Sequence, residues 1–323
     1  MVDCNPDILY QRFCNKEIDK ITLINSLLLL IEESTDEILR IAAINQLRRL
    51  GITSDHLFTV MENLIISDTN DQVRNAATRY ISYLYSEKSY NIVNWAIQYE
   101  ESYDCILTMI DTLKKMQSEE SRKLLISEIS KILEPIKDSI DKQYIFQKYR
   151  KRMKKVFKKK EISNFTMNQL AEILINYKAV SFLALKYPNF YFDLDVSNGL
   201  VSRIDLADYL QYEVKGTPFG WKNNIGSLSE VKGLSNLKYI KILDLSNNLI
   251  EDLKGLTVFQ DLEIIYLANN KISDHKNIEY LNSLPNICYI DLTGNKIAKT
   301  ISLKKFKPNV KVVLKRFDEH FEF

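Results

Sequence analysis

The sequence is poor in cysteine and has no long hydrophobic run. Its 323 residues include four cysteines, none of them in a C-x-x-C pair: Cys4, Cys14, Cys105 and Cys288. So few thiols in a chain of this length favour reduced cysteines over a disulfide framework. The longest apolar stretch, residues 27–31, is too short to cross a bilayer, and residues 1–7 carry acids where a secretory signal would be basic. We therefore expect an intracellular, cytoplasmic protein, or a nuclear one if the source is eukaryotic.

Motifs that mark several enzyme classes are also missing. There is no G-x-x-x-x-G-K-[ST] phosphate loop and no G-x-S-x-G nucleophile elbow. The three histidines, His56, His275 and His320, are isolated, with no cysteine or carboxylate at metal-ligand spacing. We therefore expect no catalytic residues, no metal, no cofactor and no small-molecule substrate, and hence a protein that is not an enzyme.

Glycine and charge are both unevenly distributed. One glycine of the eight, Gly51, precedes residue 199, which favours a helical first half and a second half that contains β-structure. The net charge of +2 combines an acidic region, a basic segment and a balanced remainder. Residues 1–147 carry 16 Lys+Arg against 23 Asp+Glu, residues 148–160 carry nine basic side chains and no acid, and the remainder carries 19 of each sign. Any affinity for phosphate must therefore come from residues 148–160.

Residues 15–147 have the apolar pattern of helices, and one pattern occurs twice. Residues 36–43 and 70–77 place an arginine and two alanines at the same offsets in both copies: Arg40 and Arg74, Ala42 and Ala76, Ala43 and Ala77. Small alanines allow close helix packing, and the arginine can bond to the preceding acidic turn. Asp36 and Asp71 suit helix starts, where acids meet the positive end of the helix dipole.

These two strings resemble HEAT repeats, a family of stacked helical hairpins. The resemblance implies an α-solenoid and a general scaffold or docking role. A plain helical bundle is the alternative, because two clear copies are fewer than the three that a repeat array needs.

A second repeat follows in the C-terminal part. Three copies align on an asparagine, and their asparagines are Asn248, Asn270 and Asn295. In each copy an L-x-L pattern places two side chains on the inward face of a short strand, and the asparagine can bond to neighbouring backbone with its carbonyl and its amide. A second apolar set closes the convex return: Ile250, Leu253 and Leu256 in one copy, Ile272 and Ile278 in the next.

This region resembles the leucine-rich-repeat family, particularly its short-repeat subgroup. The resemblance covers about residues 196–314 and rests on the strings at 243–248 (Leu-Asp-Leu-Ser-Asn-Asn) and 290–295 (Ile-Asp-Leu-Thr-Gly-Asn). It implies a curved solenoid and protein-binding activity. The predicted fold is therefore α+β and multidomain, with an N-terminal HEAT-like α-solenoid followed by a C-terminal leucine-rich-repeat α/β solenoid. The predicted parts are helical repeats at 1–147, a basic connector at 148–160, a helical bridge at 161–189 and the leucine-rich-repeat domain at 190–323.

Less regular segments flank the three copies. Leu228, Val231 and Leu234 match the convex set of the next copy, so we expect a degenerate repeat in which Trp221 and Gly226 replace leucine and asparagine. Asn198-Gly199 between alternating strands predicts a β-hairpin that caps the N-terminal edge of the array. Residues 310–314 are predicted to form the last strand.

The concave face of this array is the candidate site. The residues beside each inward pair should form two columns: Arg203, Ile242, Ile264, Tyr289 and Val312 in one, and Asp205, Asp244, Tyr266, Asp291 and Leu314 in the other. Adjacent strands lie about 4.8 Å apart, so the first column contains a continuous apolar stripe edged by aspartates. Such a surface is typical of protein contact sites. We expect a protein partner to bind there, through Ile242, Asp244, Ile264, Tyr266, Tyr289 and Asp291; alternatively, the chain's own helical domain covers the face.

The basic segment, residues 148–160, is a second candidate. Phosphate groups of RNA, DNA or anionic lipid would contact Lys151, Arg152, Lys154, Lys155, Lys158 and Lys159, with Tyr149 and Phe157 available for stacking or insertion. The same run is compatible with a nuclear-import address, or with a solvated face that offsets the acidic first half. The sequence therefore predicts a protein-binding scaffold and, as the alternative, a nucleic-acid or anionic-membrane adaptor.

Overall fold

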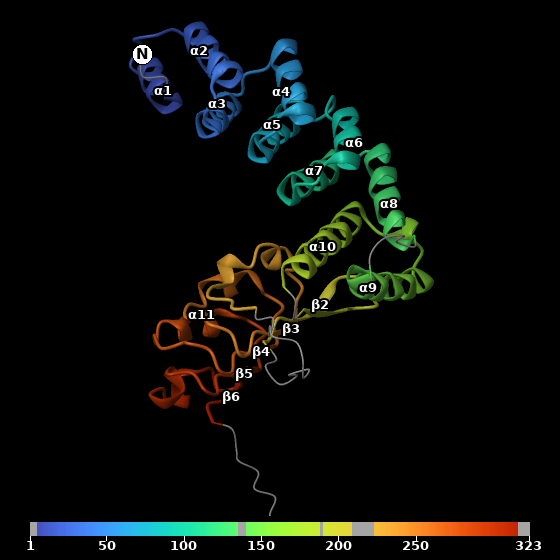
Figure 1. The fold of residues 1–323 in the computed structure, drawn as a ribbon, viewed down its shortest axis with the longest axis vertical. Helices are drawn as coiled ribbons and strands as arrows, with labels where there is room; N and C mark the ends of the chain where they lie inside the picture. The colour runs from blue at the N-terminus through green and yellow to red at the C-terminus, as the bar shows by residue number, and fades with distance from the viewer. Residues whose placement is uncertain (1–4, 135–139, 188–189, 209–222, 316–323) are drawn as a thin grey trace, which may run out of the picture. The chain divides into compact units, whose positions relative to one another are not determined.

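The structure is a computed structural model that describes residues 5–134, 140–187, 190–208 and 223–315 (Figure 1). The contacts divide the chain into two compact units, Met1–Glu128 and Ile129–Phe323. The first is helical and the second contains a mixed β-sheet, which confirms the predicted α+β layout. The division falls inside α8, upstream of the domain boundary expected after residue 147.

The first unit is built from helices that pack in pairs. They are α1 (Pro6–Cys14), α2 (Lys20–Glu33), α3 (Glu37–Arg49), α4 (Asp55–Ser67), α5 (Asp71–Leu84), α6 (Tyr90–Tyr99), α7 (Tyr103–Met116) and the start of α8 (Glu119–Leu133). α2 packs on α3, α4 on α5 and α6 on α7 (Figure 1). α5 also contacts both α3 and α7, so these three helices form one layer, and α2, α4 and α6 form the other.

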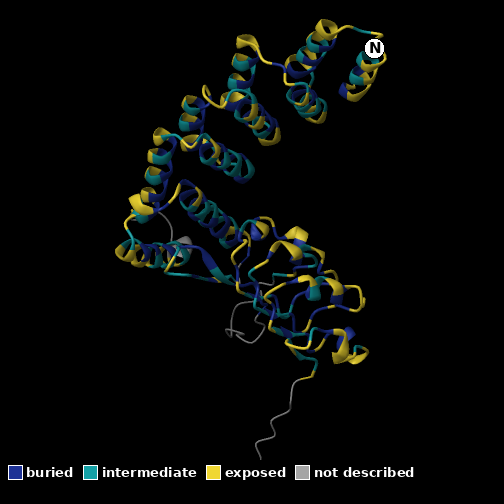
Figure 2. Cartoon of the chain, turned by 180° about the vertical axis from the view of Figure 1, so that it is seen from behind, coloured by how far each residue is buried: buried dark blue, intermediate teal, exposed yellow. Residues whose placement is uncertain are grey.

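Side-chain caps and small residues account for this packing. Asp36 accepts hydrogen bonds from the backbone N–H groups of Ile38 and Leu39 and begins α3, as predicted. Asn70 caps α5 in the same way, so Asp71 is the first helical residue. Ala43 and Ala77 are fully buried, which lets neighbouring helices approach closely. Figure 2 shows the buried residues of each helix in dark blue.

The second unit contains two long helices and a six-stranded sheet. Its elements are α9 (Ile140–Lys159), α10 (Met167–Lys186), β1 (Tyr191–Leu194), β2 (Val201–Asp205), β3 (Ile242–Asp244), β4 (Ile264–Tyr266), α11 (Asn277–Ser283), β5 (Tyr289–Asp291) and β6 (Lys311–Val313), with short 3-10 turns at Ile162–Asn164, Leu228–Glu230, Leu234–Asn236, Lys254–Val258, Ile297–Lys299 and Leu303–Lys305. The strands lie in chain order. β1 and β2 are antiparallel, which confirms the hairpin, and every later pair from β2 to β6 is parallel. Gly199 has a φ of +78°, which suits the hairpin turn.

Buried asparagines link each repeat to the next. The Asn270 Nδ2 donates to the carbonyl oxygens of Leu245 in the preceding repeat (2.9 Å) and Leu267 in its own (3.0 Å). Its Oδ1 accepts from the Ile250 N–H at 2.9 Å. Asn248 and Asn295 make the equivalent bonds. The predicted role of these asparagines is confirmed, and each one satisfies backbone groups that burial would otherwise leave unpaired.

The first repeat differs from the prediction. The Asn223 Nδ2 donates to the Leu206 carbonyl oxygen at 2.8 Å, and the Ile225 N–H donates to the Asn248 Oδ1 at 3.1 Å. Asn223 therefore takes the place of the buried asparagine in the first repeat. The expectation that Gly226 replaces the asparagine is wrong. β2 and the segment after residue 223 belong to one repeat, interrupted by an insertion, residues 209–222, between Asp208 and Asn223. Trp221 lies outside the described residues.

The last strand is offset from the predicted pairing by a single position. In β6, Lys311 pairs with Tyr289 and Val313 pairs with Asp291. Lys311 and Val313 therefore continue the two columns, in place of the predicted Val312 and Leu314. The first predicted column places Val312 beside Tyr289, but Lys311 holds that place. Val312 consequently pairs with the fully buried Ile290.

Candidate functional site

The sheet face that the sequence predicts to be concave carries two columns of side chains. Pairing between strands aligns Arg203, Ile242, Ile264, Tyr289 and Lys311 in the first column, and Asp205, Asp244, Tyr266, Asp291 and Val313 in the second. All six predicted site residues, Ile242, Asp244, Ile264, Tyr266, Tyr289 and Asp291, lie on this face with intermediate exposure. The central residue of each strand faces the opposite way, and Leu243, Ile265 and Ile290 are fully buried.

The aspartates of the second column have a structural role that the sequence pattern did not indicate. Each accepts, through Oδ1, the backbone N–H of the second residue after it: Ala207 to Asp205 at 3.1 Å, Ser246 to Asp244 at 2.9 Å, and Thr293 to Asp291 at 2.9 Å. These bonds form Asx turns that end the strands. The carboxylates therefore hold the loops after the strands, in addition to giving the face its acidity.

The surroundings of Asp244 oppose its ionisation. Burial raises its pKa above the ordinary value of 3.8, and the neighbouring charge of Asp205 adds to the rise. Hydrogen bonds from Ser246 and the charge of Arg203 act in the other direction but do not cancel it. The centre of the face is thus a place where negative charge is costly.

Aromatic side chains occupy the middle of the face. The rings of Tyr266 and Tyr289 lie 5.4 Å apart, on adjacent strands. Tyr266 stands where β2, β3 and β5 carry an aspartate, and it closes no Asx turn. The Lys311 Nζ lies 5.7 Å from the Tyr289 ring centre. Together with Ile242 and Ile264, the two tyrosines form a half-exposed apolar surface, which we call the tyrosine patch.

Helix α9 borders this face at its β1 edge. Tyr191 pairs with Asp205 and Asp193 with Arg203, so β1 extends both columns by one strand. The Lys148 Nζ lies 3.2 Å from the Tyr191 ring centre and donates to the Phe192 carbonyl oxygen at 2.7 Å. An ion pair of 2.9 Å joins Arg152 to Asp193. Two side chains of the predicted basic segment are therefore used to attach α9 to the sheet.

Among the remaining side chains of the basic segment, the apolar ones pack inside the unit and most of the lysines are exposed. Tyr149, Met153 and Val156 are buried, and Phe157 packs edge-on against Phe165 at 5.8 Å. Burial also raises the pKa of Tyr149. The expectation that Tyr149 is available for stacking is therefore wrong, because it fills the core between α9, Tyr177 of α10 and Phe192 of β1. The lysines predicted to bind phosphate are all exposed: Lys151, Lys154, Lys155, Lys158 and Lys159.

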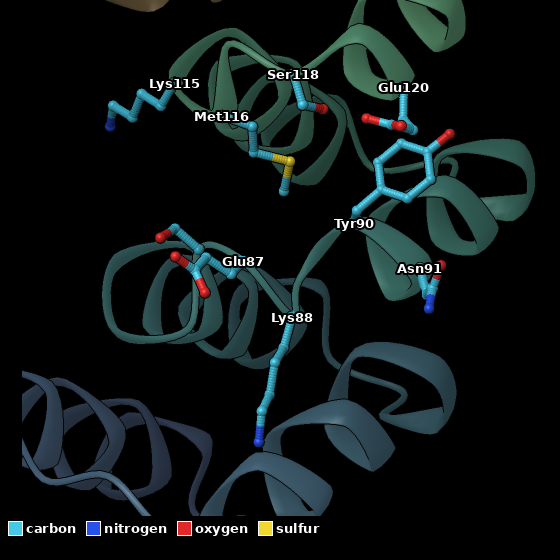
Figure 3. A pocket seen from close by; sticks show the side chains of 9 residues that line it. Glu87, Lys88, Tyr90, Asn91, Lys115, Met116, Ser118 and Glu120 are labelled. Atoms are coloured by element: carbon cyan, nitrogen blue, oxygen red, sulfur yellow. The ribbon is translucent and has the colours of Figure 1, made fainter.

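The first unit has its own surface pocket, of about 600 Å³ (Figure 3). Its lining comes from the segment between α5 and α6 and from the end of α7 and start of α8: Ser86, Glu87, Lys88, Tyr90, Asn91, Lys115, Met116, Ser118 and Glu120. In Figure 3 the side chains of Lys88 and Lys115 extend in different directions, and Lys88 pairs with Asp55 outside the lining. The two acids and two bases do not converge on one point.

No family model matches this chain. No curated protein matches it either. Among the described residues, no three or more histidine, cysteine, aspartate or glutamate side chains are grouped as metal ligands. In the same residues, no helix has the length and apolar character needed to cross a membrane.

Proposed function

We propose that this protein is a non-enzymatic scaffold that combines a HEAT-like α-solenoid with a leucine-rich-repeat solenoid and binds a protein partner on its concave face. The observation that supports this proposal best is the tyrosine patch. It presents two aromatic rings and two isoleucines in register, on short strands whose backbone is fixed on both sides. Tyrosine in such a rigid setting is among the residue types most enriched in protein-binding hot spots.

The ladder of asparagines supports the leucine-rich-repeat part of the proposal. Each repeat supplies one strand, one asparagine and one apolar return, and the same bonds recur with the same geometry. A repeat of this kind cannot bury its own core, so neighbouring repeats must stack. The recurrence of hydrogen bonds, rather than of sequence alone, is what supports membership of this family.

Arginine bonds support the HEAT-like part. Arg40 of α3 is paired with Asp68, which precedes α5, and Arg74 of α5 is paired with Glu100, which precedes α7. Each arginine also donates to backbone carbonyls of the preceding turn, Arg40 to Ile31 and Arg74 to Asp68. The same bridge thus recurs in successive helix pairs. In both helix pairs the paired acid lies after the arginine in the sequence, just before the next helix of the same layer. Bonds to the segment before the arginine, where the sequence pattern suggested a partner, are made to backbone carbonyl oxygens.

We also propose that the protein functions in a reducing, intracellular compartment. The described cysteines Cys14, Cys105 and Cys288 are free thiols. Burial raises the pKa of Cys105 to about 12, which suppresses its reactive thiolate form.

Paired alanine substitutions test the partner proposal. Tyr266→Ala with Tyr289→Ala should weaken capture of partner proteins from extracts of the source organism by at least about 10-fold, because each hot-spot truncation costs about 1–2 kcal/mol. The variant should remain folded, since neither side chain closes a turn. Quantitative affinity capture, with circular dichroism of the same samples, measures both effects.

Tyr83→Ala provides the matched control. Tyr83 lies on α5 and is 74% exposed, so its removal deletes an equally large exposed ring elsewhere. Capture that is unchanged in the double variant, or reduced equally in the control, would contradict the proposed site.

A further inference from the structure

The exposed lysines of α9 form one continuous face. Lys151, Lys154, Lys155, Lys158 and Lys159 follow the i, i+3, i+4, i+7, i+8 spacing that places side chains on one side of a helix. We call this surface the lysine face. The buried stripe of the same helix, Tyr149, Met153 and Val156, lies on the other side.

The lysine face carries charge that the rest of the fold does not neutralise. Within the described part of the chain, Lys151, Lys154, Lys155 and Lys158 have no ion-pair partner. Lys159 interacts electrostatically with Asp195, without the short contact of an ion pair. By contrast, Arg152 and Lys148 at the edge of the helix are held by Asp193 and the Phe192 backbone. The five exposed lysines can therefore meet an external anion.

From this arrangement we infer that the lysine face binds double-stranded nucleic acid through its phosphate backbone. From residue 151 to residue 159 the helix rises about 12 Å. A duplex carries one phosphate charge for about every 1.7 Å of its axis when both strands are counted, so a stretch of that length contains about seven phosphates, of which the helix faces those on one side. Five lysines on a rigid helix match this density of charge. Because lysine is a flexible point charge, the contact selects phosphate and not base sequence.

The apolar side chains of α9 distinguish this ligand from two others. Single-stranded nucleic acid is held by bases that stack on exposed aromatic rings, but Tyr149 is buried and Phe157 packs against Phe165. A helix that lies in a membrane surface needs a free apolar face to insert. Here the apolar stripe of α9 is already used against α10 and β1. Between residues 148 and 160, every exposed side chain of α9 is a lysine, which suits a surface of phosphates.

A binding assay on the full-length protein tests the inference. Fluorescence anisotropy would follow 20-base-pair duplex DNA and duplex RNA of mixed sequence, the matching single strands, phosphatidylserine vesicles and polyglutamate. We expect either duplex to bind more tightly than the other three probes, with no preference between two unrelated sequences. The DNA and RNA arms identify which duplex is the ligand.

Charge variants locate the binding surface. The triple variant Lys154→Gln, Lys155→Gln, Lys158→Gln should bind the duplex at least 10-fold more weakly at low salt. Its slope of log K against log salt should fall by about 2.7, which is three contacts at about 0.9 each. The same three positions changed to arginine should retain binding, because the positive charges remain. The control triple Lys254→Gln, Lys271→Gln, Lys276→Gln removes equal charge from exposed positions of the repeat array and should leave binding unchanged.

Several results would overturn the inference. They are absence of duplex binding at low salt, equal loss in the two glutamine triples, tighter binding to vesicles or to polyglutamate, and a wild-type salt slope close to zero. The wild-type slope needs no variant, so the inference stays testable even if a substitution disturbs folding.

Discussion

At the level of single residues, aspartate and asparagine side chains both stabilise the sheet, but they bond to different parts of the backbone. Asparagines inside the array bond to the backbone of the neighbouring repeat, as Asn270 does with Leu245 and Ile250. Aspartates on the face bond to their own turn, as Asp244 does with Ser246. In three repeats the residue before the buried asparagine is left-handed: Asn247, Asn269 and Gly294 all have positive φ. A Cβ on Gly294 would lie 2.1 Å from the Asn269 Oδ1, so a side chain here would force the Asn269 amide to move.

The raised pKa of Asp244 leads to a prediction with a defined pH dependence. An amide at this position can still accept the Ser246 N–H but carries no charge, so Asp244→Asn should stabilise the protein at neutral pH. Since the folded-state pKa lies above the unfolded value of 3.8, the cost of ionisation is present above the folded pKa and absent below about 3.8. The difference in melting temperature between variant and wild type should therefore disappear on acidification.

Asp244→Ala is the control for this prediction. It removes both the charge and the acceptor, and the lost bond to Ser246 should cost about 1 kcal/mol. An asparagine variant that is less stable than wild type at pH 7, as judged by thermal melts, would show that the carboxylate charge is favourable where it lies.

At the scale of whole elements, the sequence predicted the central strands of the array but not its two ends. The asparagine period located β3, β4 and β5 and their columns, because a buried amide with a fixed set of partners leaves a strong pattern. It failed at both ends of the array. The insertion at 209–222 broke the spacing, and the asparagine at 223 was missed; its signal was the string Asn223-x-Ile225, which resembles Asn248-x-Ile250. The predicted position of β6 was wrong by one residue, because the repeat there has no ladder asparagine to fix the register of the strand.

The basic segment, residues 148–160, was also only partly predictable from the sequence. The nine positive charges in residues 148–160 are evident from the sequence. The sequence does not show which of these side chains attach α9 to the sheet and which are exposed. That division depends on which side of α9 packs against β1, and therefore on Asp193 and Tyr191, which belong to a strand beyond the next long helix. Tyr149 was assigned to the wrong side for this reason.

Deletion of residues 209–222 tests the repeat assignment. In the regular repeats the ladder asparagine directly follows the residue equivalent to Asp208, as Asn248 follows Asn247. Joining Asp208 to Asn223 should therefore restore the regular spacing and leave a folded protein, with the melting temperature changed by no more than a few degrees. Circular dichroism and thermal melts provide the measurement. Asn223→Ala in the shortened chain should then be clearly destabilising, because the Leu206 carbonyl oxygen would lose this donor; loss of folding in the deletion itself would refute the assignment.

Across the whole molecule, two compact units use repeated polar bridges, and those of the first unit are ionic. Burial opposes ionisation of Glu100, but hydrogen bonds from Arg74 and Ser102 outweigh it, and the pKa of Glu100 is lowered. The Arg74–Glu100 contact of 2.8 Å leaves the glutamate side chain 4% exposed. An unpaired arginine in this place would be costly.

Glu100→Gln should therefore destabilise the first unit by about 2 kcal/mol at neutral pH. A carboxyl with a lowered folded pKa stabilises above its ordinary value of 4.5, and that stabilisation is lost as pH falls through the folded value. The variant should consequently approach the wild type in acid. Hydrogen exchange that is faster in α5 to α7, with unchanged rates in β3 to β5, would be the expected result. The exposed neighbour Glu101→Gln is the control, and an equal effect there would argue against the bridge.

The order of the strands has a consequence for how the second unit folds. Parallel sheets usually form slowly, because their strands are far apart in sequence. Here each strand from β3 to β6 pairs with the next strand along the chain, so one repeat is all that separates two partners. The insertion lengthens the connection between β2 and β3, which adds only about 0.5 kcal/mol of loop-closure entropy. Folding should therefore begin among β3 to β6, before β2 pairs with β3.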